Sequence, residues 1–290
     1  MRPGTKLAET LNSGRLALTA QCIVSDVADA EGVRRLAADF PSMLDALVIC
    51  DGDREASLSA LACSSLLASQ GLEPVLAVST RDRNRIALLS DIRGAAMLGV
   101  GNVLCLAGDH QSLGPQPEAA GAYDIDSVQL IYLLREMGDD ASGRALLIGA
   151  EAYPHLRPLE LALLDARKKV AAGAQFLLTQ PVFDLTAFDE WMTAARAEGL
   201  PERAAIIAGV QPLAGLEHAE ALRRRRRVIP EPVLTRLRDA SEPEQEGIAI
   251  CAETAAALKG IQGVRGVHVY WGGAPNVVAE VMTRAALAPA

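Results

Sequence analysis

The sequence predicts an α/β fold, a (β/α)8 barrel formed by a single domain over residues 1–290. Three observations predict it. Short apolar runs that suit buried strands alternate with amphipathic segments that suit helices, and there are eight of each. The early strands begin roughly 29 residues apart, the length of one βα unit. The chain has 290 residues, which is ordinary for such a barrel and long for most other single domains.

The elements follow one another in a regular order. Residues 1–14 carry little pattern and are expected to be a lead-in segment. The predicted strands are apolar runs: Leu16–Ile23, Ala46–Cys50, Pro74–Ser79, Asn102–Leu106, Ala145–Gly149, Gln175–Thr179, Ala204–Val210 and Gly266–Tyr270. The predicted helices have apolar residues at intervals of three and four: Ala28–Asp39, Ser57–Gln70, Arg83–Leu98, Ile125–Met137, Pro158–Ala172, Leu185–Ala197, Leu216–Arg226 and Pro275–Leu287.

Two connections are longer than the rest. A loop rich in Gly, Pro and Gln, Gln111–Gly121, follows the fourth predicted strand, and extra helical segments at Glu231–Ala240 and Glu246–Lys259 follow the seventh. A doubly wound open sheet is the alternative fold. It would more often show five to seven strands and a glycine-rich phosphate turn after the first strand, and no G-x-G-x-x-G motif occurs in this sequence.

Composition excludes several classes of function. The net charge of −8 argues against nucleic acid as a partner, and the run Arg223–Arg227 is interpreted as a solvated helix end. The five cysteines are widely separated and lack a C-x-x-C pair, which favours a reducing cytoplasm over a disulfide scaffold or a zinc site. No run of ~18 apolar residues and no signal-peptide pattern is present, so we expect a soluble cytoplasmic protein and no membrane partner.

Polar and aromatic residues gather just past the predicted strands, at the edge where barrel enzymes place their active sites. These stretches are Gln21–Asp26, Asp51–Asp53, Ser79–Asp82, Gly108–His110, Glu151–His155, Gln180–Asp184, Gln211–Pro212 and Trp271–Gly273. An aspartate past a strand often caps the next helix, and this alternative stands for Asp82, Asp126 and Asp184. The set as a whole indicates a binding site.

Several of these stretches resemble the methylenetetrahydrofolate reductase family, in particular its short bacterial type. The similarity is carried by Arg81–His110, Tyr123–Leu130 (YDIDSVQL), Lys168–Asp184 (KKVAAGAQFLLTQPVFD), Ile207–Leu213 (IAGVQPL) and Gly263–His268 (GVRGVH). The resemblance therefore runs through most of the chain. It implies a (β/α)8 flavoprotein of one-carbon metabolism, an oxidoreductase that reduces methylenetetrahydrofolate to methyltetrahydrofolate with NAD(P)H and FAD.

The resemblance also assigns roles to residues. Asp109 matches an aspartate that lies near the flavin and contacts the pterin, Gln180 matches a glutamine that contacts folate or nicotinamide, and Phe183 is placed with them at the substrate. The implied FAD contacts are Asp51, Gly108, Asp109, Asp126, Tyr153 and Lys169. Asp126 and Lys169 would hold the ribose and phosphate portions, and the lysine supplies a charge that suits a diphosphate. A metal site is not implied.

The sequence departs from the family pattern at three places. Gln21 stands where the first strand ordinarily ends in a glutamate, the general acid that helps open the folate ring, so Gln21 occupies the catalytic position with an amide. Losing such a proton donor typically costs ~10²–10⁴ in rate. Ala77 replaces a histidine that packs against the flavin, and the last strand ends in Tyr270-Trp271-Gly272-Gly273.

These departures leave three functions open. The chain is a working reductase in which another acid does the proton work, with Asp51, Asp53, Glu151 and His155 as candidates. Alternatively it is a divergent member that binds flavin or folate without full activity, as an accessory subunit or homo-oligomer. The third interpretation is a pterin-binding barrel that transfers the methyl group of methyltetrahydrofolate.

Overall fold

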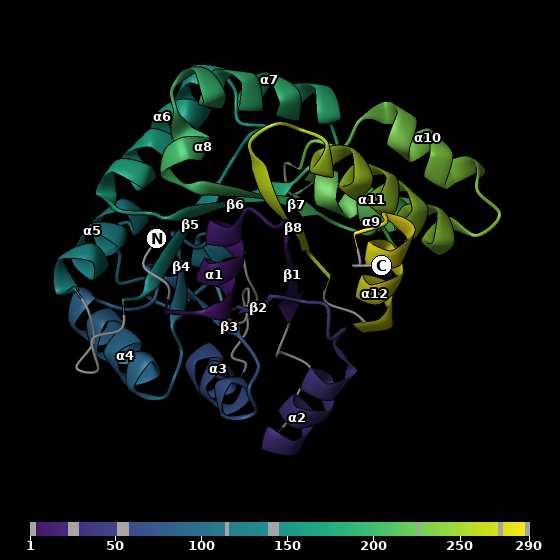
Figure 1. The fold of residues 1–290 in the computed structure, drawn as a ribbon. Helices are drawn as coiled ribbons and strands as arrows, with labels where there is room; N and C mark the ends of the chain where they lie inside the picture. Colours follow the sequence, from purple (N-terminus) through teal and green to yellow (C-terminus); the bar gives the residue numbers. More distant parts are fainter. Residues whose placement is uncertain are drawn as a thin grey trace.

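The structure is a computed structural model that describes residues 4–22, 29–50, 58–113, 116–138, 145–224, 227–271 and 275–287. In these ranges the chain forms a closed barrel of eight parallel strands surrounded by helices (Figure 1). Each strand pairs with the next one in sequence, and the eighth returns to pair with the first. The predicted (β/α)8 architecture is therefore confirmed.

The strands are short, apolar and almost wholly buried, as expected for a parallel sheet covered on its outer face. They are β1 (Ala17–Cys22), β2 (Ala46–Ile49), β3 (Pro74–Ser79), β4 (Asn102–Leu106), β5 (Leu147–Ala152), β6 (Phe176–Pro181), β7 (Ala205–Val210) and β8 (Val264–Val269).

Helices alternate with these strands and form the outer wall of the barrel. They are α1 (Lys6–Ser13), α2 (Ala30–Asp39), α3 (Ala60–Ser69), α4 (Arg85–Met97), the 3-10 turn η1 (Gln111–Leu113), α5 (Ser127–Met137), α6 (Leu159–Ala172), α7 (Leu185–Ala197), α8 (Leu200–Arg203), α9 (Leu216–Arg224), α10 (Glu231–Asp239), α11 (Pro243–Lys259) and α12 (Pro275–Arg284). None of the described helices is long and apolar enough to cross a membrane.

Side-chain caps fix where several of these helices begin. The Asn84 side chain accepts a hydrogen bond from the Ala87 N–H at the start of α4. The Asp184 side chain accepts one from the Ala187 N–H at the start of α7. The capping role considered for Asp82 is therefore wrong, because Asn84 holds that position and Asp82 instead forms an ion pair with Arg81 at 2.7 Å.

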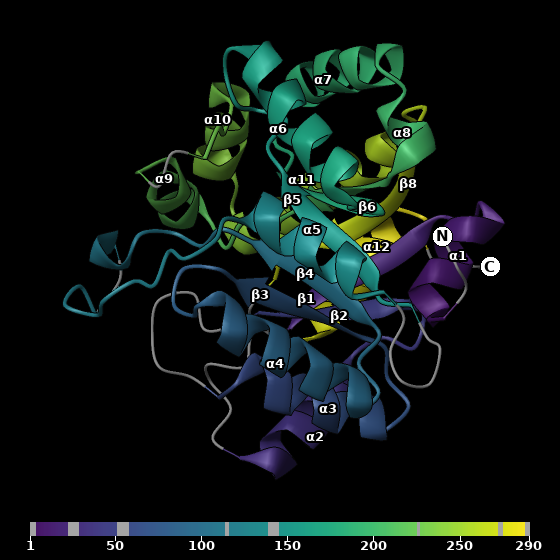
Figure 2. The ribbon, with the colours of Figure 1, turned by 90° about the vertical axis from the view of Figure 1, so that its left-hand side faces the viewer.

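Residues 1–14, expected to be a lead-in segment, contain a helix that closes one end of the barrel. Leu7, Ala8 and Leu11 of α1 are buried in the same apolar cluster as the residues that fill the barrel interior. Gly14 ends the helix in the left-handed region at φ 83°, where a residue with a side chain would be strained. Figure 2 shows α1 at one end of the barrel and α9 and α10 at the opposite end.

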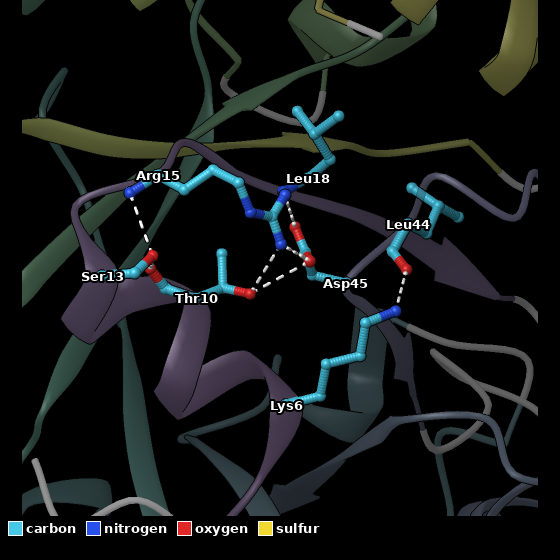
Figure 3. Close-up of polar contacts among 7 residues, drawn as sticks. All are labelled: Lys6, Thr10, Ser13, Arg15, Leu18, Leu44 and Asp45. Atoms are coloured by element: carbon cyan, nitrogen blue, oxygen red, sulfur yellow. Dashed lines mark hydrogen bonds and ion pairs between the residues drawn. The ribbon is translucent and has the colours of Figure 1, made fainter. Parts of the chain in front are cut away.

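A buried carboxylate ties α1 to the bottom of the barrel. Asp45, only 1% exposed, precedes β2 and accepts hydrogen bonds from the Leu18 N–H at 2.9 Å and from the Thr10 hydroxyl at 3.1 Å. The guanidinium of Arg15 forms an ion pair with the same carboxylate, and Lys6 donates to the Leu44 carbonyl at 3.1 Å (Figure 3). The acid thus connects α1, the turn that follows it and β1 to the start of β2.

Two strands run further than the sequence predicted. The fifth strand was expected over Ala145–Gly149 and the sixth over Gln175–Thr179, but β5 continues to Ala152 and β6 to Pro181. The predicted strands ended where polar residues began. In the folded barrel, however, Glu151 and Gln180 follow the buried residues Ala150 and Thr179 and continue the strands. The change matters because it moves Glu151 and Gln180 from loops into the barrel wall.

Candidate functional site

The candidate site lies inside the barrel at the C-terminal ends of the strands. In β1, Ala17 packs in the interior cluster while Leu18 and Ala20 pack under the helices, so Gln21 shares the inward face with Ala17. The same alternation applies to the other strands. It brings the following residues to the mouth: Gln21, Cys50, Ser79, Leu106, Glu151, Gln180 and Tyr270.

Glu151 is the acid that this arrangement places in the mouth. In β5, Leu147 is an interior residue while Ile148 and Ala150 pack outward, so Glu151 points inward. Gly149, the inward residue between them, leaves room for a ring: a Cβ there would lie 2.0 Å from Cζ of Phe176. Below Glu151 the barrel is therefore filled with apolar side chains.

A compact polar network surrounds Glu151. The Tyr153 hydroxyl donates to its Oε2 at 2.6 Å. Lys169 donates to the Glu151 carbonyl oxygen at 2.8 Å and to Oδ2 of Asp165 at 2.6 Å, and its ammonium group lies 4.8 Å from the centre of the Tyr153 ring. Burial raises the pKa of Glu151, and this effect exceeds the opposing effects of the Tyr153 hydrogen bond and the charges of Arg227 and Lys169.

On β8, a buried histidine supports a tyrosine in the mouth. His268 is fully buried and its Nδ1 lies 2.9 Å from the Thr19 hydroxyl, while burial lowers its pKa to about 3. Its ring meets that of Tyr270 edge-on, with centroids 4.4 Å apart. The Tyr270 hydroxyl donates to the Thr179 carbonyl at 3.0 Å, and burial raises the pKa of this phenol well above its usual value.

Gln180 offers the mouth an unsatisfied hydrogen-bonding group. The residue is 8% exposed, and Oε1 has no hydrogen-bond partner among the residues that the structure describes. Because a buried polar atom without a partner is unfavourable, such an atom in a ligand site commonly awaits the ligand. Thr179, its neighbour, is satisfied: its hydroxyl accepts from the Gly209 N–H at 2.9 Å.

The stretch after β4 brings backbone close to the mouth. Gly108 has φ 80°, and a Cβ on it would lie 2.3 Å from the Ser79 hydroxyl oxygen, so only glycine fits there. The next residue, Asp109, is exposed, and its carbonyl accepts from Arg81 at 2.9 Å. This hydrogen bond fixes the backbone of Asp109 at the rim, and with it the carboxylate that the resemblance assigns to the pterin.

Two residues with roles implied by the resemblance also have structural roles. Asp126 caps α5, accepting from the Gln129 N–H at 2.7 Å while the Gln129 side chain accepts from the Asp126 N–H at 3.0 Å. Phe183 lies in a separate apolar cluster with Leu213 and residues of α9 to α11. Asp126 remains exposed, whereas Phe183 is mostly covered.

Of the other candidate acids, only His155 lies in the described part of the chain. Asp51 and Asp53 lie outside the described residues. His155 is described, and neither of its ring nitrogens has a hydrogen-bond partner within the described part of the chain. Burial lowers the pKa of His155, so it is a poor proton donor near neutral pH. Among the candidates that the structure describes, Glu151 is the one whose environment favours the protonated form.

A hollow outside the barrel is unrelated to this site. A groove with a volume of about 570 Å³ lies on the outer wall at α5 and α6, lined by residues that include Arg85, Tyr132 and Lys168. It contains none of the side chains that the resemblance assigns to substrate or flavin. Two features near the mouth were not predicted from the sequence: the alternating pair His268 and Tyr270 at the end of β8, and the pairing of Lys169 with Asp165 one turn earlier on α6.

Comparison with known sequences gives one consistent family. Residues 30–285 match the family model described as methylenetetrahydrofolate reductase. The chain is 24% identical over 239 residues to a probable methylenetetrahydrofolate reductase (NADPH) of Caenorhabditis elegans, covering 79% of this chain and 34% of that protein. It is 24% identical over 206 residues to the 5,10-methylenetetrahydrofolate reductase of Pectobacterium carotovorum subsp. carotovorum, covering 69% of this chain and 65% of that protein. The chain thus spans less than two thirds of the length of these two relatives.

Solved structures with similar architecture include a protein of Clostridium thermocellum described as binding two copies of 5-methyl-5,6,7,8-tetrahydrofolic acid. It superimposes with a TM-score of 0.69 at 12% identity and covers 97% of this chain and 98% of its own. DmoA from Hyphomicrobium sulfonivorans has a TM-score of 0.58 at 11% identity, with 93% of this chain and 86% of its own covered. At these identities the likeness shows the fold alone.

Proposed function

The chain belongs to the methylenetetrahydrofolate reductase family, and we propose that it reduces 5,10-methylenetetrahydrofolate to 5-methyltetrahydrofolate with NAD(P)H by way of bound FAD. The observation that carries the proposal is the polar mouth of the barrel, in which the buried Gln180 amide oxygen has no partner among the described residues. Pterin and isoalloxazine rings both carry N–H groups from which this oxygen can accept a hydrogen bond. The proposed site is therefore a slot for a flat heterocycle.

Folate binding is assigned to the β4 rim. Asp109 is exposed at the end of β4, next to Gly108, whose positive φ turns the chain at the rim and whose missing side chain leaves the space that the Ser79 hydroxyl fills. The amino-pyrimidine edge of a pterin presents two N–H donors, which suit a carboxylate that accepts through both oxygens. Gln180 faces the same mouth from β6, two strands along the barrel, and would accept a further hydrogen bond from the ring.

The residues assigned to FAD fit that group in chemical type. When bound, FAD carries two electrons from NAD(P)H to the folate. The Lys169 ammonium has three N–H donors, of which two are used within the protein, so a phosphate oxygen would have to reach the third one on a residue that is 4% exposed. Asp126 caps α5 through Oδ1, and as an exposed residue it presents its second oxygen to a ribose hydroxyl. The centre of the Tyr153 ring lies 4.8 Å from the Lys169 ammonium group.

A second candidate function is that of a binding subunit without full reductase activity. Gln21 favours it, because an amide at the position of the usual acid cannot deliver a proton. This alternative keeps the folate slot and removes the reaction. The two candidates differ in a measurable step, the opening of the folate ring.

The proposal is tested by following the flavin through both half-reactions. FAD is titrated into the purified chain, and NADH and NADPH are then mixed with the complex under anaerobic conditions while the flavin absorbance is recorded. Methylenetetrahydrofolate is added last. We expect saturable FAD binding, bleaching by at least one nicotinamide nucleotide, and recovery of the absorbance on addition of the folate.

The possible failures have different meanings. Absence of FAD binding at micromolar concentration would overturn the flavin assignment. Flavin reduction without recovery of the absorbance by folate would favour the binding subunit, provided that 5-methyltetrahydrofolate still binds in an equilibrium titration.

A further inference from the structure

We infer that Glu151 is the proton donor that opens the folate ring in this chain, replacing from the opposite wall of the barrel the acid that Gln21 lacks. The inference rests on the proposed function and names a catalytic residue for it. Two kinds of observation support it, the position of Glu151 relative to Gln21 and the surroundings of its carboxyl group.

The strand register places Glu151 across the barrel from Gln21. β1 and β5 are separated by three strands in either direction around the closed barrel. The pairing register connects Gln21 on β1, by way of β2, β3 and β4, to Leu147 on β5. Because strands of such a barrel tilt by about 36°, each step to the next strand shifts the height by about one residue. After four steps, the residue of β5 at the height of Gln21 is therefore about four positions beyond Leu147, which is Glu151.

The path in the other direction gives the same answer. Thr19 on β1 is connected through β8 and β7 to Pro181 on β6. Pro181 lies two residues beyond the partner of Ala152 on β5, so this path meets β5 after its last residue. The two paths therefore reach β5 on opposite sides of Glu151. Glu151 and Gln21 lie at about the same height, both pointing into the mouth.

The surroundings of Glu151 favour the protonated form of its carboxyl group, which can donate a proton. The charge of Lys169, which donates to the Glu151 carbonyl oxygen, is already paired with Asp165 at 2.6 Å, and the Tyr270 hydroxyl donates to the Thr179 carbonyl. The titratable and charged groups that face Glu151 are Tyr153, Lys169, Arg227, Asp109 and Tyr270. Burial outweighs the Tyr153 hydrogen bond and the cations among them and raises the pKa of Glu151, which shifts the carboxyl toward the protonated form that a general acid needs.

The proton transfer balances without another reactant. The O–H bond of the Glu151 carboxyl breaks and an N–H bond forms on the folate nitrogen that leaves the methylene bridge. The C–N bond to that nitrogen breaks with its electron pair moving to nitrogen, and the bridging carbon stays on the other nitrogen as an iminium cation. No oxidation state changes in this step. The hydride that then reduces the iminium comes from NAD(P)H in the proposed reaction.

The test compares four proteins: the natural chain, Glu151→Gln, Glu151→Gln combined with Gln21→Glu, and Glu160→Gln. Glu160 is an exposed carboxylate in the first turn of α6 and serves as the matched control. Infrared difference spectra of the flavin-free proteins report whether a protonated carboxyl is present at pH 7. Stopped-flow measurements record flavin reduction by NAD(P)H and reoxidation by methylenetetrahydrofolate separately, and an equilibrium titration gives the affinity for 5-methyltetrahydrofolate.

We expect Glu151→Gln to remove a protonated-carboxyl band and to slow reoxidation by folate roughly 10²–10⁴-fold, with flavin reduction and folate affinity within about threefold of the natural chain. The double variant should recover most of the folate rate, because its acid sits across the barrel at the same height. The Glu160→Gln control should match the natural chain in every measurement.

Other results would overturn the inference. A folate rate unchanged in Glu151→Gln, or a natural chain without the protonated-carboxyl band, means that Glu151 is not the acid. If the natural chain reduces its flavin but is not reoxidised by folate, no acid is at work and the inference fails while the flavin assignment stands. If no flavin binds, the proposed function fails first and the inference falls with it.

Discussion

The Tyr153 hydroxyl donates a 2.6 Å hydrogen bond to Oε2 of Glu151 from the same end of β5. The two residues are separated by one position, which lets the phenol reach back over the acid. This contact favours the charged carboxylate, whereas burial favours the neutral acid and is the larger effect. The pKa of Glu151 therefore depends on two opposing effects, burial and the Tyr153 hydrogen bond. A single substitution at Tyr153 removes the second.

Tyr153→Phe should raise the pKa of Glu151 further, because it deletes the hydrogen bond to the carboxylate and leaves burial unopposed by it. The loss of the protonated-carboxyl infrared band should then occur at higher pH than in the natural chain. Tyr132→Phe, a change on the exposed face of α5, is the control. A band that titrates at the same or lower pH in Tyr153→Phe would contradict the expected sign.

Asp109→Asn should weaken binding of 5-methyltetrahydrofolate by about 1–3 kcal/mol, since one acceptor becomes a donor facing the donors of the pterin. That corresponds to roughly one to two powers of ten in Kd. Glu118→Gln, an exposed change in the same loop, should leave Kd unchanged. Equal affinities of the Asn variant and the natural chain would mean that Asp109 serves only the rim and its following turn.

Lys169→Ala should weaken FAD binding, because the variant lacks the ammonium donor assigned to a phosphate oxygen. It should also destabilise the fold, since Lys169 is 4% exposed and holds both Asp165 and the Glu151 carbonyl. The neighbouring Lys168→Ala, an exposed change on α6, controls for loss of charge alone. FAD affinity in Lys169→Ala equal to that in Lys168→Ala would remove Lys169 from the flavin site.

The barrel could be predicted from the sequence because its strands are nearly pure apolar runs at regular spacing. The errors occurred at the ends of β5 and β6, where Glu151 and Gln180 interrupt the apolar pattern yet continue the strand. An inward polar residue at a barrel mouth resembles a loop residue in the sequence. Helix α1 was missed although Leu7 and Leu11 have helical spacing, because a segment of eight residues gives little periodicity to detect.

The candidate site could be predicted from the sequence only in part, for a similar reason. Matching motifs singled out Asp109, Gln180 and Lys169, which follow or flank strands, and their roles stay predictions. The relation between Gln21 and Glu151 could not be read from the sequence, because it depends on the register of four successive strand pairs. Likewise, the burial of Lys169 against Asp165 is a property of the packed helix and changes what the lysine has left to offer a ligand.

His268 makes the stability of the fold depend on pH. Its pKa is lowered to about 3 in the folded barrel, while an unfolded histidine titrates near 6.5. Below about pH 6.5 the unfolded chain therefore binds a proton that the folded chain does not, so stability falls as the pH falls. The contribution is about 1.4 kcal/mol per pH unit, down to about pH 3.

Urea unfolding of the natural chain and of His268→Gln at several pH values between 4 and 8 checks this. The difference in free energy of unfolding between the two proteins should change with pH by the slope given above, even though carboxylates titrate in both. Parallel curves for the two proteins would show that His268 is protonated in the folded state as readily as in the unfolded one.

Asp45→Ala should lower the free energy of unfolding by roughly 2–4 kcal/mol, because several donors lose a buried charged acceptor. The ion pair with Arg15 is the smaller part, since that side chain is 53% exposed and its guanidinium can return to water. The larger part comes from the Leu18 N–H and the Thr10 hydroxyl, which stay buried without the carboxylate. Asp39→Ala, an exposed change at the end of α2, should shift stability by less than about 0.5 kcal/mol. If chemical denaturation gives the two alanine variants equal stability, α1 is held by Leu7 and Leu11 alone and the acid beneath the barrel is dispensable.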